Sequence, residues 1–302
     1  AGLPSGALYG FTNTLLALIR EEKARCMAVA LDAPGPTFRH ERFAAYKATR
    51  PEMPADLVPQ VPYFYRLIES LGVCSLSRPG LEADDLIASL VRKAQELEWD
   101  AVVVSADKDF GQLIRPGVRQ FVPSRGAEPS RWLDESAIRE RYGVAPAQFV
   151  DYLALIGDAI DNVPGVSGIG PKTAVRLLTE HGSLDEILAR ASEITPPSLR
   201  QRLEEGRAAA LLSRELVRLR ADLPVDDPNG FHLPDPASRP AFRELLRELE
   251  FRAIERRVFG APPSRQASLL EEDGQEAPGA RAEDASPPEA PAADAAGTRA
   301  AG

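Results

Sequence analysis

The chain has 302 residues, of which 44% are hydrophobic and 27% are charged, the balance of a globular protein with a substantial core. Two cysteines exclude a disulfide scaffold and a four-thiolate zinc site, and three histidines leave little for a histidine-rich metal site. Any metal is therefore expected to have carboxylate ligands. No apolar run reaches 18 residues, so the sequence predicts no membrane span. The net charge is −9, a weak argument against nucleic-acid binding that an acidic active site could account for.

The first half of the chain alternates between predicted helices and short apolar strands. In chain order we expect a helix at 5–20, a strand at 26–31, a helix at 55–71, a strand at 73–77, a helix at 82–97, and strands at 101–105 and 118–122. Strands that alternate with helices are typical of an α/β layer with a mainly parallel sheet. The sequence therefore predicts an α/β core over residues 1–145.

After about residue 146 the strand signal fades and short helical patterns follow. They fall at 146–157, 171–180, 183–190, 198–205 and 207–219, with one longer amphipathic helix at 239–259. The last 42 residues contain 13 alanines and six prolines, no aromatic residue, and eight acidic side chains against three basic ones. That composition cannot bury a core. We therefore predict a helical region over 146–260 and a disordered linker over 261–302.

Acidic residues gather where the predicted elements begin or end. Asp32 follows the strand at 26–31, Glu82, Asp84 and Asp85 open the helix at 82–97, Asp107 and Asp109 follow the strand at 101–105, and Asp158 and Asp161 lie in IGDAIDN. Each group alone could be a turn residue or a helix cap. Because the carboxyl ends of parallel strands meet at one edge of a sheet, we expect the groups to converge there, and Asp32 to lie near Asp107. If their segment is helical, Asp158 and Asp161 share a face.

Such a cluster of carboxylates is unstable unless cations neutralise it. Oxygen ligands select hard ions, chiefly Mg²⁺ or Mn²⁺. Two such ions can activate a water and stabilise the leaving oxygen of a phosphodiester. The acidic residues therefore predict hydrolysis of a phosphodiester.

The stretch NVPGVSGIGPKTAVRLL at 162–178 is the most specific pattern in the chain. Gly165, Gly168 and Gly170 precede a proline at the first position of a predicted helix. A tight glycine turn between two helices exposes backbone N–H groups that bind phosphate. Lys172 and Arg176 would contact the same DNA strand. The pattern predicts sequence-independent binding, and its alternative is a tight helix–helix turn with glycines for packing.

The segment FRHERFAAYKATR at 38–50 interleaves basic and aromatic residues. Such a mixture suits a single nucleic-acid strand, with phosphates on the cations and bases stacked on the rings. Lys47 and Arg50 are expected to share a helical face, and the bordering prolines indicate a mobile loop or arch. The alternative is an amphipathic helix that packs its aromatic residues inward.

Taken together, these segments resemble the 5′-nuclease domain at the N-terminus of bacterial DNA polymerase I, a member of the flap-endonuclease family. The matching strings are YGF at 9–11, LDAPGPTFRHERFAAYKATR at 31–50, PGLEADDLIASL at 79–90, SADKDFGQL at 105–113 and GDAIDNVPGVSGIGPKTA at 157–174. They cover about residues 5–260 in the family's order. The resemblance implies a PIN-like α/β fold with a helix–three-turn–helix DNA-binding element, and metal-dependent hydrolysis of 5′ flaps and 5′ ends of DNA in replication and repair.

The resemblance also implies roles for individual residues. The metal ligands would be Asp32, Glu82, Asp84, Asp107, Asp109, Asp158 and Asp161, with Asp85 adjacent. Lys47 and Arg50 would be catalytic, steering and polarising the scissile phosphate. DNA-binding residues would be Arg39, Tyr46, Gly165, Gly168, Gly170, Lys172, Thr173 and Arg176. Two Mg²⁺ or Mn²⁺ ions are expected, with a monovalent cation at the 165–173 hairpin.

The implied setting is a monomer in the bacterial cytoplasm, associated with the nucleoid, whose partners are DNA and a polymerase domain after residue 302. The family's first strand, which bears an aspartate, has no counterpart before Ala1. We therefore expect an internal piece of a longer polymerase, less stable and less active than a full-length domain. Two other functions stay open: a non-catalytic DNA-binding module, which would not need so many acids, and a toxin-like PIN ribonuclease, which would lack the glycine hairpin.

Overall fold

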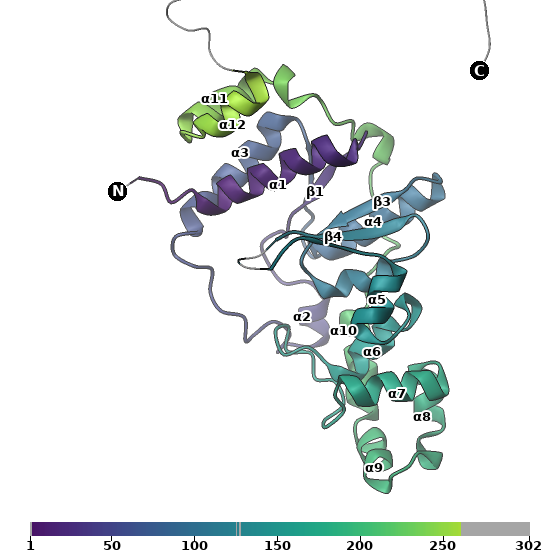
Figure 1. The fold of residues 1–302 in the computed structure, drawn as a ribbon. Coiled ribbons are helices and arrows are strands. Elements are labelled where there is room, and N and C mark those ends of the chain that lie inside the picture. Colours follow the sequence, from purple (N-terminus) through teal and green to yellow (C-terminus); the bar gives the residue numbers. More distant parts are fainter. Residues whose placement is uncertain (1, 125, 127, 261–302) are drawn as a thin grey trace, which may run out of the picture. The chain divides into compact units, whose positions relative to one another are not determined.

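The computed structural model describes residues 2–124, 126 and 128–260 (Figure 1). The α-helices of this part are α1 (Gly6–Glu22), α2 (Phe38–Arg42), α3 (Val61–Leu71), α4 (Ala83–Glu96), α5 (Glu135–Tyr142), α6 (Phe149–Ile156), α7 (Pro171–His181), α8 (Leu184–Ala189), α9 (Pro197–Glu205), α10 (Arg207–Val217), α11 (Pro240–Glu248) and α12 (Arg252–Phe259). Its strands are β1 (Ala28–Ala30), β2 (Cys74–Leu76), β3 (Ala101–Val104), β4 (Val118–Val122) and β5 (Arg131–Leu133). The predicted linker at 261–302 lies outside the described residues.

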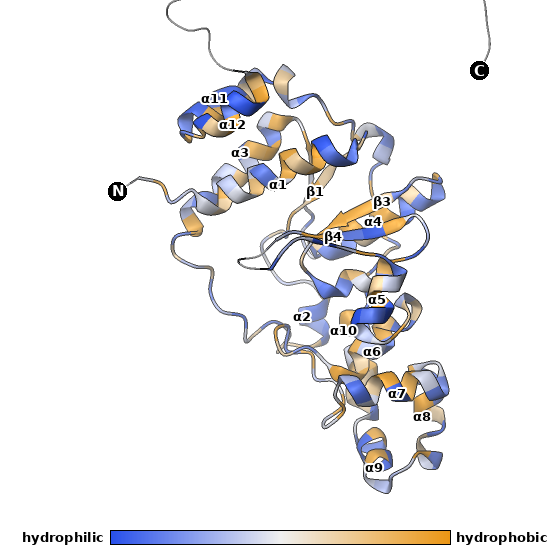
Figure 2. Ribbon diagram, in the orientation of Figure 1, coloured by the Kyte–Doolittle hydropathy of each residue, from blue (hydrophilic) through white to orange (hydrophobic). Residues whose placement is uncertain are grey.

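The strands form two small sheets. In the first, β1 pairs with β2 in parallel, with Ala28 opposite Cys74. In the second, β4 lies between β3, to which it is parallel, and β5, to which it is antiparallel. Figure 2 shows that β3 is hydrophobic along its length, as its run of valines predicts. The α/β fold with parallel pairing is confirmed, whereas β5 and α5 were not predicted, because a three-residue strand carries almost no periodic signal.

The first and last described helices share one core, although they are far apart in sequence. Leu8 of α1, Leu67 of α3, Phe242 of α11 and Ile254 of α12 are all fully buried in it. Figure 1 shows α11 and α12 beside α1 and α3. Residues 240–259 therefore belong with the N-terminal helices in packing, and they hold the segment that leads into β1.

A second core joins the middle of the chain. It contains Phe149 and Leu153 of α6, Leu177 of α7 and Ala210 of α10, and it extends to Ile138 of α5. The α/β part and the helices of residues 146–217 thus share a continuous hydrophobic core. No helix in the described ranges is long and apolar enough to cross a membrane.

Two expectations about local structure are wrong, and the condition attached to a third is not met. The predicted helix at 239–259 is two helices, broken where Glu250 adopts a φ of +57° so that Phe251 can turn into the core. Helix α2 ends at Arg42, and Lys47 has a φ of +57°, so Lys47 and Arg50 do not share a helical face. Asp158 and Asp161 lie in a turn closed by the pairing of Asp158 with Val163, because Gly157 ends α6.

Candidate active site

The seven predicted metal ligands lie on loops and a helix start after β1, β2, β3 and α6; we call them the acid site. They are Asp32, Glu82, Asp84, Asp107, Asp109, Asp158 and Asp161. Asp32, just after β1, accepts a hydrogen bond from the backbone N–H of Ala83 at the start of α4 (2.8 Å). Asp107, after β3, accepts one from the N–H of Asp109 (2.9 Å). These hydrogen bonds cap the starts of helical segments and also hold the two carboxylates in place. A role as a helix cap and a role in the site are therefore compatible for Asp32 and Asp107.

Two carboxylates of the acid site are buried against their neighbours. Burial, with the nearby charges of Asp107, Asp32 and Glu82, raises the pKa of Asp84 to about 7. Burial, with the charges of Asp107, Asp158 and Asp161, raises the pKa of Asp109 to about 7. Oδ1 of Asp109 is buried and accepts no hydrogen bond. The predicted convergence of Asp32 with Asp107 therefore occurs, around Asp84, although β1 and β3 belong to different sheets.

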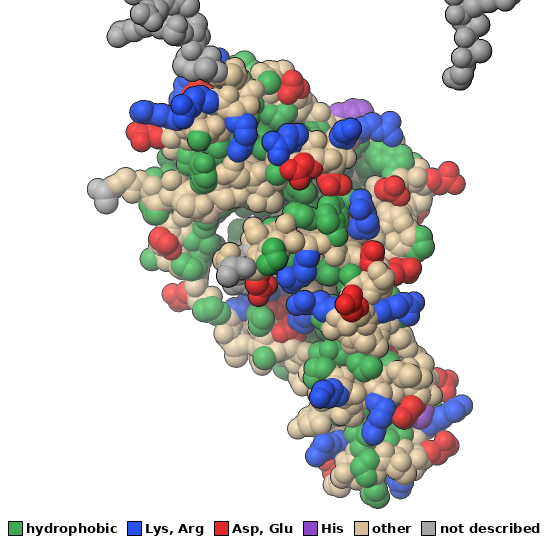
Figure 3. Space-filling model, viewed as in Figure 1, with side chains coloured by type: hydrophobic (Ala, Val, Ile, Leu, Met, Phe, Trp, Pro, Cys, Tyr) green, Lys and Arg blue, Asp and Glu red, His purple; other side chains and the backbone are tan. Residues whose placement is uncertain are grey.

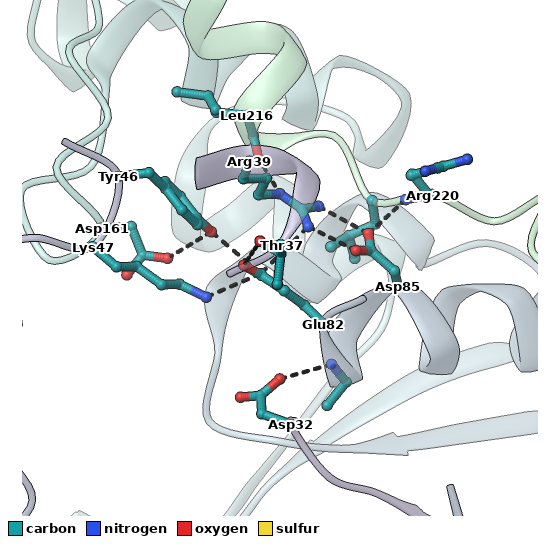
Figure 4. Close-up of polar contacts among 12 residues, drawn as sticks. Asp32, Thr37, Arg39, Tyr46, Lys47, Glu82, Asp85, Asp161, Leu216 and Arg220 are labelled. Carbon is teal, nitrogen blue, oxygen red and sulfur yellow. Dashed lines mark hydrogen bonds and ion pairs between the residues drawn. The ribbon is translucent and has the colours of Figure 1, made fainter. Parts of the chain in front are cut away.

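Basic side chains lie among these acids. Lys47 Nζ is 2.9 Å from Glu82 Oε2, and Arg50 donates to Asp161 Oδ1 through Nε (2.9 Å) and through Nη2 (2.6 Å). Lys108 forms a close ion pair with Asp158. Burial favours a raised pKa for Asp158, but the hydrogen bond and charge of Lys108 outweigh it, and the pKa is lowered. Figure 4 shows Lys47 and Asp161 on the same side of Glu82.

The donors of the acid site fit a hard divalent cation in their chemistry. All seven are carboxylates, one buried oxygen accepts no hydrogen bond, and burial, together with neighbouring acids, raises the pKa of two of them to about 7. As they stand, no three acidic, histidine or cysteine side chains in the described part of the chain converge closely enough to enclose an ion. The ammonium groups of Lys47 and Lys108 now neutralise some of the acids that a metal would.

Arg39 is not on the surface where a DNA contact was expected. Its side chain is 1% exposed and forms two hydrogen bonds with the Asp85 carboxylate, at 2.7 and 2.8 Å. It also donates to the backbone oxygens of Leu216 and Arg218. Figure 4 shows this pair behind Glu82, which Arg39 approaches at 3.3 Å. With no accessible surface, Arg39 cannot touch DNA in this structure, and Asp85 is its counter-ion.

Tyr46 is likewise buried, with 4% of its surface exposed, so its ring has no free face for a DNA base. Its hydroxyl donates to Glu82 at 3.3 Å or to Asp161 at 3.4 Å. Burial and the charge of Glu82 raise its pKa, which keeps the hydroxyl a donor. Tyr46 therefore links two acid groups, and the inward packing considered for the aromatic residues of 38–50 is correct at this position.

The glycine hairpin, residues 165–173, is built by close backbone contact. Gly165 has a φ of +62°, and a Cβ there would lie 2.5 Å from the backbone nitrogen of Gly157. Its N–H donates to the buried hydroxyl of Ser213 on α10 (2.9 Å). Gly168 has a φ of +76°, and its carbonyl oxygen accepts a hydrogen bond from Arg202 Nη1 (3.1 Å). Gly170 has an ordinary φ of −97° and open space around it, so it is not required sterically.

Helix α7 begins at Pro171 with Gly170 as its N-cap, as predicted. Lys172 and Arg176 are exposed one turn apart on it, and Thr173 is half-buried beside them. Figure 3 shows basic and acidic side chains interspersed over the face in view. The glycine hairpin and the first turns of α7 thus place the exposed side chains of Lys172 and Arg176 close to the N-terminus of a helix.

Four residues that position the site were missed by the sequence analysis. Thr37 caps α2 and donates to Glu82, Asn162 donates to the Ala45 carbonyl, Lys108 pairs with Asp158, and Ser213 holds Gly165. Only Thr37 carries a sequence signal, as a helix-capping residue type before FRHER. The other three act across contacts of 48 to 117 residues in sequence, which no local pattern reveals.

Comparison with known proteins matches both halves of this architecture. Residues 1–143 match the family "5′-3′ exonuclease, N-terminal resolvase-like domain", and residues 144–238 match "5′-3′ exonuclease, C-terminal SAM fold". The thermostable DNA polymerase I of Thermus thermophilus is 38% identical over 254 residues, which are 84% of this chain and 30% of the polymerase.

Solved structures share the fold. A T5 5′-exonuclease with bound zinc superposes with a TM-score of 0.62 at 24% identity, covering 83% of this chain and 91% of the other. A complex of the T5 D15 flap endonuclease with DNA and metal ions superposes with a TM-score of 0.61 at 23% identity, covering 80% and 90%. With both halves matched, the chain belongs to the 5′-3′ exonuclease family of DNA hydrolases and is homologous to the N-terminal part of bacterial DNA polymerase I.

Proposed function

We propose that this chain is a metal-dependent, structure-specific nuclease that hydrolyses phosphodiester bonds at 5′ flaps and 5′ ends of DNA, within a DNA polymerase I that acts in replication and repair. The observation that carries the proposal is the acid site: seven carboxylates from four segments, with Lys47 and Arg50 beside them. A purely DNA-binding module has no use for buried carboxylates that repel one another.

In the proposed reaction, a water oxygen bonds to phosphorus, the bond to the leaving sugar oxygen breaks, and that oxygen takes a proton. Bound Mg²⁺ or Mn²⁺, two ions in our proposal, would lower the pKa of water and act as a Lewis acid. The seven carboxylates would hold the ions. Asp109 is a strong candidate ligand, because its buried Oδ1 accepts no hydrogen bond and has only the Lys108 ammonium nearby, at 3.6 Å.

The basic residues would act on the phosphate itself. Lys47 and Arg50 are anchored to Glu82 and Asp161, and both anchors are proposed metal ligands. Once released from those carboxylates, the two side chains would bind the scissile phosphate and stabilise its developing charge. Tyr46 and Asn162 would keep the 43–50 turn against the acid site while Lys47 and Arg50 exchange their carboxylate partners for the phosphate.

The glycine hairpin would bind the duplex away from the cleavage point. Gly165, Gly168, Gly170, Lys172, Thr173 and Arg176 are the proposed contacts. The start of α7 and the exposed Lys172 suit a phosphate backbone and carry no base readout, so binding would be independent of sequence. A monovalent cation at this hairpin is part of the same proposal.

The test is incubation with a labelled 5′-flap DNA and a labelled single-stranded RNA, with Mg²⁺ or with EDTA. We expect cleavage of the flap only with Mg²⁺. Binding of the flap without cleavage in Mg²⁺ would support the non-catalytic module instead. Preferential cleavage of the RNA would support a PIN ribonuclease.

A further inference from the structure

A second hollow, separate from the acid site, lies between α2, α4 and the segment that follows α10; we call it the arginine pocket. Its volume is about 690 Å³, and no carboxylate of the acid site lines it in the described part of the chain. Its lining includes Phe38, Leu219, the arginines Arg42, Arg92, Arg218 and Arg220, and the carboxylates Glu41, Glu215 and Asp222. Small-molecule sites typically fall between about 300 and 1,000 Å³, so the pocket has room for one nucleotide.

Four guanidinium groups surround this pocket. Arg42 is paired with Glu215 at 2.5 Å, and Arg220 lies 3.8 Å from Asp222. Arg218 forms no ion pair with any residue that the structure describes, and its side chain is exposed. Arginine forks bind phosphate in a bidentate manner and are weakly hydrated. The four arginines and three carboxylates of the lining give it a formal charge of +1, and Arg42, Arg92 and Arg220 each lie in an ion pair with a carboxylate.

The apolar part of the pocket contains an aromatic ring. Phe38 has the Arg220 guanidinium 5.2 Å from its ring centroid and the buried Arg39 guanidinium at 4.6 Å. Arg220 is exposed, so it can leave the ring when another planar group replaces it. Aromatic and guanidinium planes are the surfaces on which nucleic-acid bases stack. The pocket therefore offers a stacking surface next to Arg218, whose guanidinium forms no ion pair with a described residue.

The pocket wall is hydrogen-bonded to the buried ion pair of Arg39 and Asp85. The Arg220 N–H donates to Asp85 Oδ1 (2.9 Å), and Arg39 donates to the Arg218 carbonyl (3.1 Å). These backbone bonds fix residues 218–220, so replacing the side chains there leaves the wall in place. The pocket is therefore preorganised, and its ligand contacts can be removed without removing the bonds that hold it.

We propose that the arginine pocket binds a nucleoside 5′-phosphate unit, with the base on Phe38 and the phosphate on Arg218 and Arg220. The unit could be a free nucleotide or part of a single strand. Either source presents the same chemistry, a planar base and a dianionic or diester phosphate about one nucleotide in size.

The test is isothermal titration of the protein in EDTA with deoxyadenosine 5′-monophosphate, with the 5′-phosphorylated tetramer of deoxyadenosine, and with inorganic phosphate. We expect both nucleotides to bind, and phosphate to bind much more weakly. Tighter binding of the tetramer identifies a strand site, and equal binding identifies a free nucleotide. Phosphate that binds as tightly as the nucleotides, or no binding of any probe, overturns the proposal.

Variants locate the binding. Phe38→Leu removes the stacking surface, and Arg218→Gln with Arg220→Gln removes the phosphate contacts; each is expected to weaken nucleotide binding by about fivefold or more. Arg252→Gln, on the basic surface of α12, is the matched control and should change nothing. Melting temperatures verify folding, and the glutamine pair remains informative if Phe38→Leu does not fold. Equal affinity of the glutamine pair and the parent contradicts the proposal.

Discussion

The acid site and the glycine hairpin are adjacent, yet they are built by different means. The acid site is made of charged side chains from the segment after β1, the start of α4, the loop after β3 and the loop after α6. Partners distant in sequence hold Asp32, Glu82, Asp158 and Asp161. The hairpin is made of backbone, within one short segment, and its charged residues are exposed. The two regions meet at Gly157 and Gly165, whose backbones touch just before Asp158.

Because they are built differently, the two regions are sensitive to different substitutions. In the acid site, each buried charge needs its counter-charge, so loss of one partner leaves another uncompensated. In the hairpin, a single added methyl group displaces backbone, whereas loss of a surface charge changes only binding. Substitutions at buried charges and at glycines can therefore be used to separate these two kinds of vulnerability.

The largest effect on stability is expected at the buried ion pair. Arg39→Leu leaves Asp85 buried without a cation and should lower the free energy of unfolding by about 3–5 kcal/mol. Arg42→Leu is the matched control on the same helix, because its pair with Glu215 is half exposed, and it should cost less than about 1 kcal/mol. Urea denaturation measures both. Similar losses for the two variants would show that burial of Arg39 does not govern its contribution.

In the glycine hairpin, stability should be most sensitive to substitutions that displace the backbone. Gly165→Ala combines a φ of +62° with contacts of 2.5 Å to Gly157, and we expect a loss of about 2–4 kcal/mol together with displacement of Asp158. Gly170→Ala, with an ordinary φ and open space, should cost less than about 1 kcal/mol. Thermal melting compares the pair. If Gly170→Ala is the more damaging, the steric account of the hairpin is incorrect.

Stability of the metal-free protein should depend on pH through the acid site. The pKa values of Asp84 and Asp109 are raised from 3.8 to about 7, so the folded state binds more protons than the unfolded state between these values. The free energy of unfolding should therefore fall as pH rises from about 4 to about 7. The lowered pKa of Asp158 acts with the opposite sign, but only below its ordinary value.

The measurement is the melting temperature in EDTA from pH 5 to pH 8, repeated with Mg²⁺. We expect the melting temperature to decrease toward pH 8, and Mg²⁺ to restore it there. The double variant Asp84→Asn with Asp109→Asn should remove most of the decrease. A melting temperature that rises across this range in EDTA would be inconsistent with two carboxylates whose pKa is raised by burial and by neighbouring acids.

The smallest effect is expected at Lys172. Lys172→Ala should weaken binding of all DNA sequences alike and reduce the slope of log affinity against log salt by about one unit. Stability should not change, because the side chain is exposed. Fluorescence anisotropy with two unrelated duplexes at several salt concentrations tests this. An altered sequence preference with an unchanged slope would point to a base contact.

Features that depend on neighbouring residues could be predicted from the sequence. The structure confirms three elements that were predicted from local signals. These are strand β3 with its valines, helix α4 with Asp84 in its first turn, and helix α7, which begins at Pro171. The proximity of Asp32 to Asp107 was predicted for a different reason, since β1 and β3 lie in separate sheets and not along one edge.

Features that depend on tertiary packing could not be predicted. Arg39 and Arg42 lie on one short helix with similar composition around them, and only the fold places Arg39 against Asp85 and leaves Arg42 at the surface. Tyr46 resembles a stacking residue in sequence but is covered by the acid site. Glu250 breaks a continuous amphipathic pattern because Phe251 has a place in the core.

The most direct test of the account compares cleavage and binding of one 5′-flap DNA in Mg²⁺ by the parent chain and its Asp107→Ala variant. The account predicts that the variant loses about a thousandfold in single-turnover cleavage rate, equivalent to about 4 kcal/mol of transition-state stabilisation. It also predicts that the dissociation constant for the flap is unchanged or lower, because one negative charge near the phosphate is gone. A variant that cleaves within about tenfold of the parent, or a parent with no Mg²⁺-dependent cleavage, contradicts the central claim.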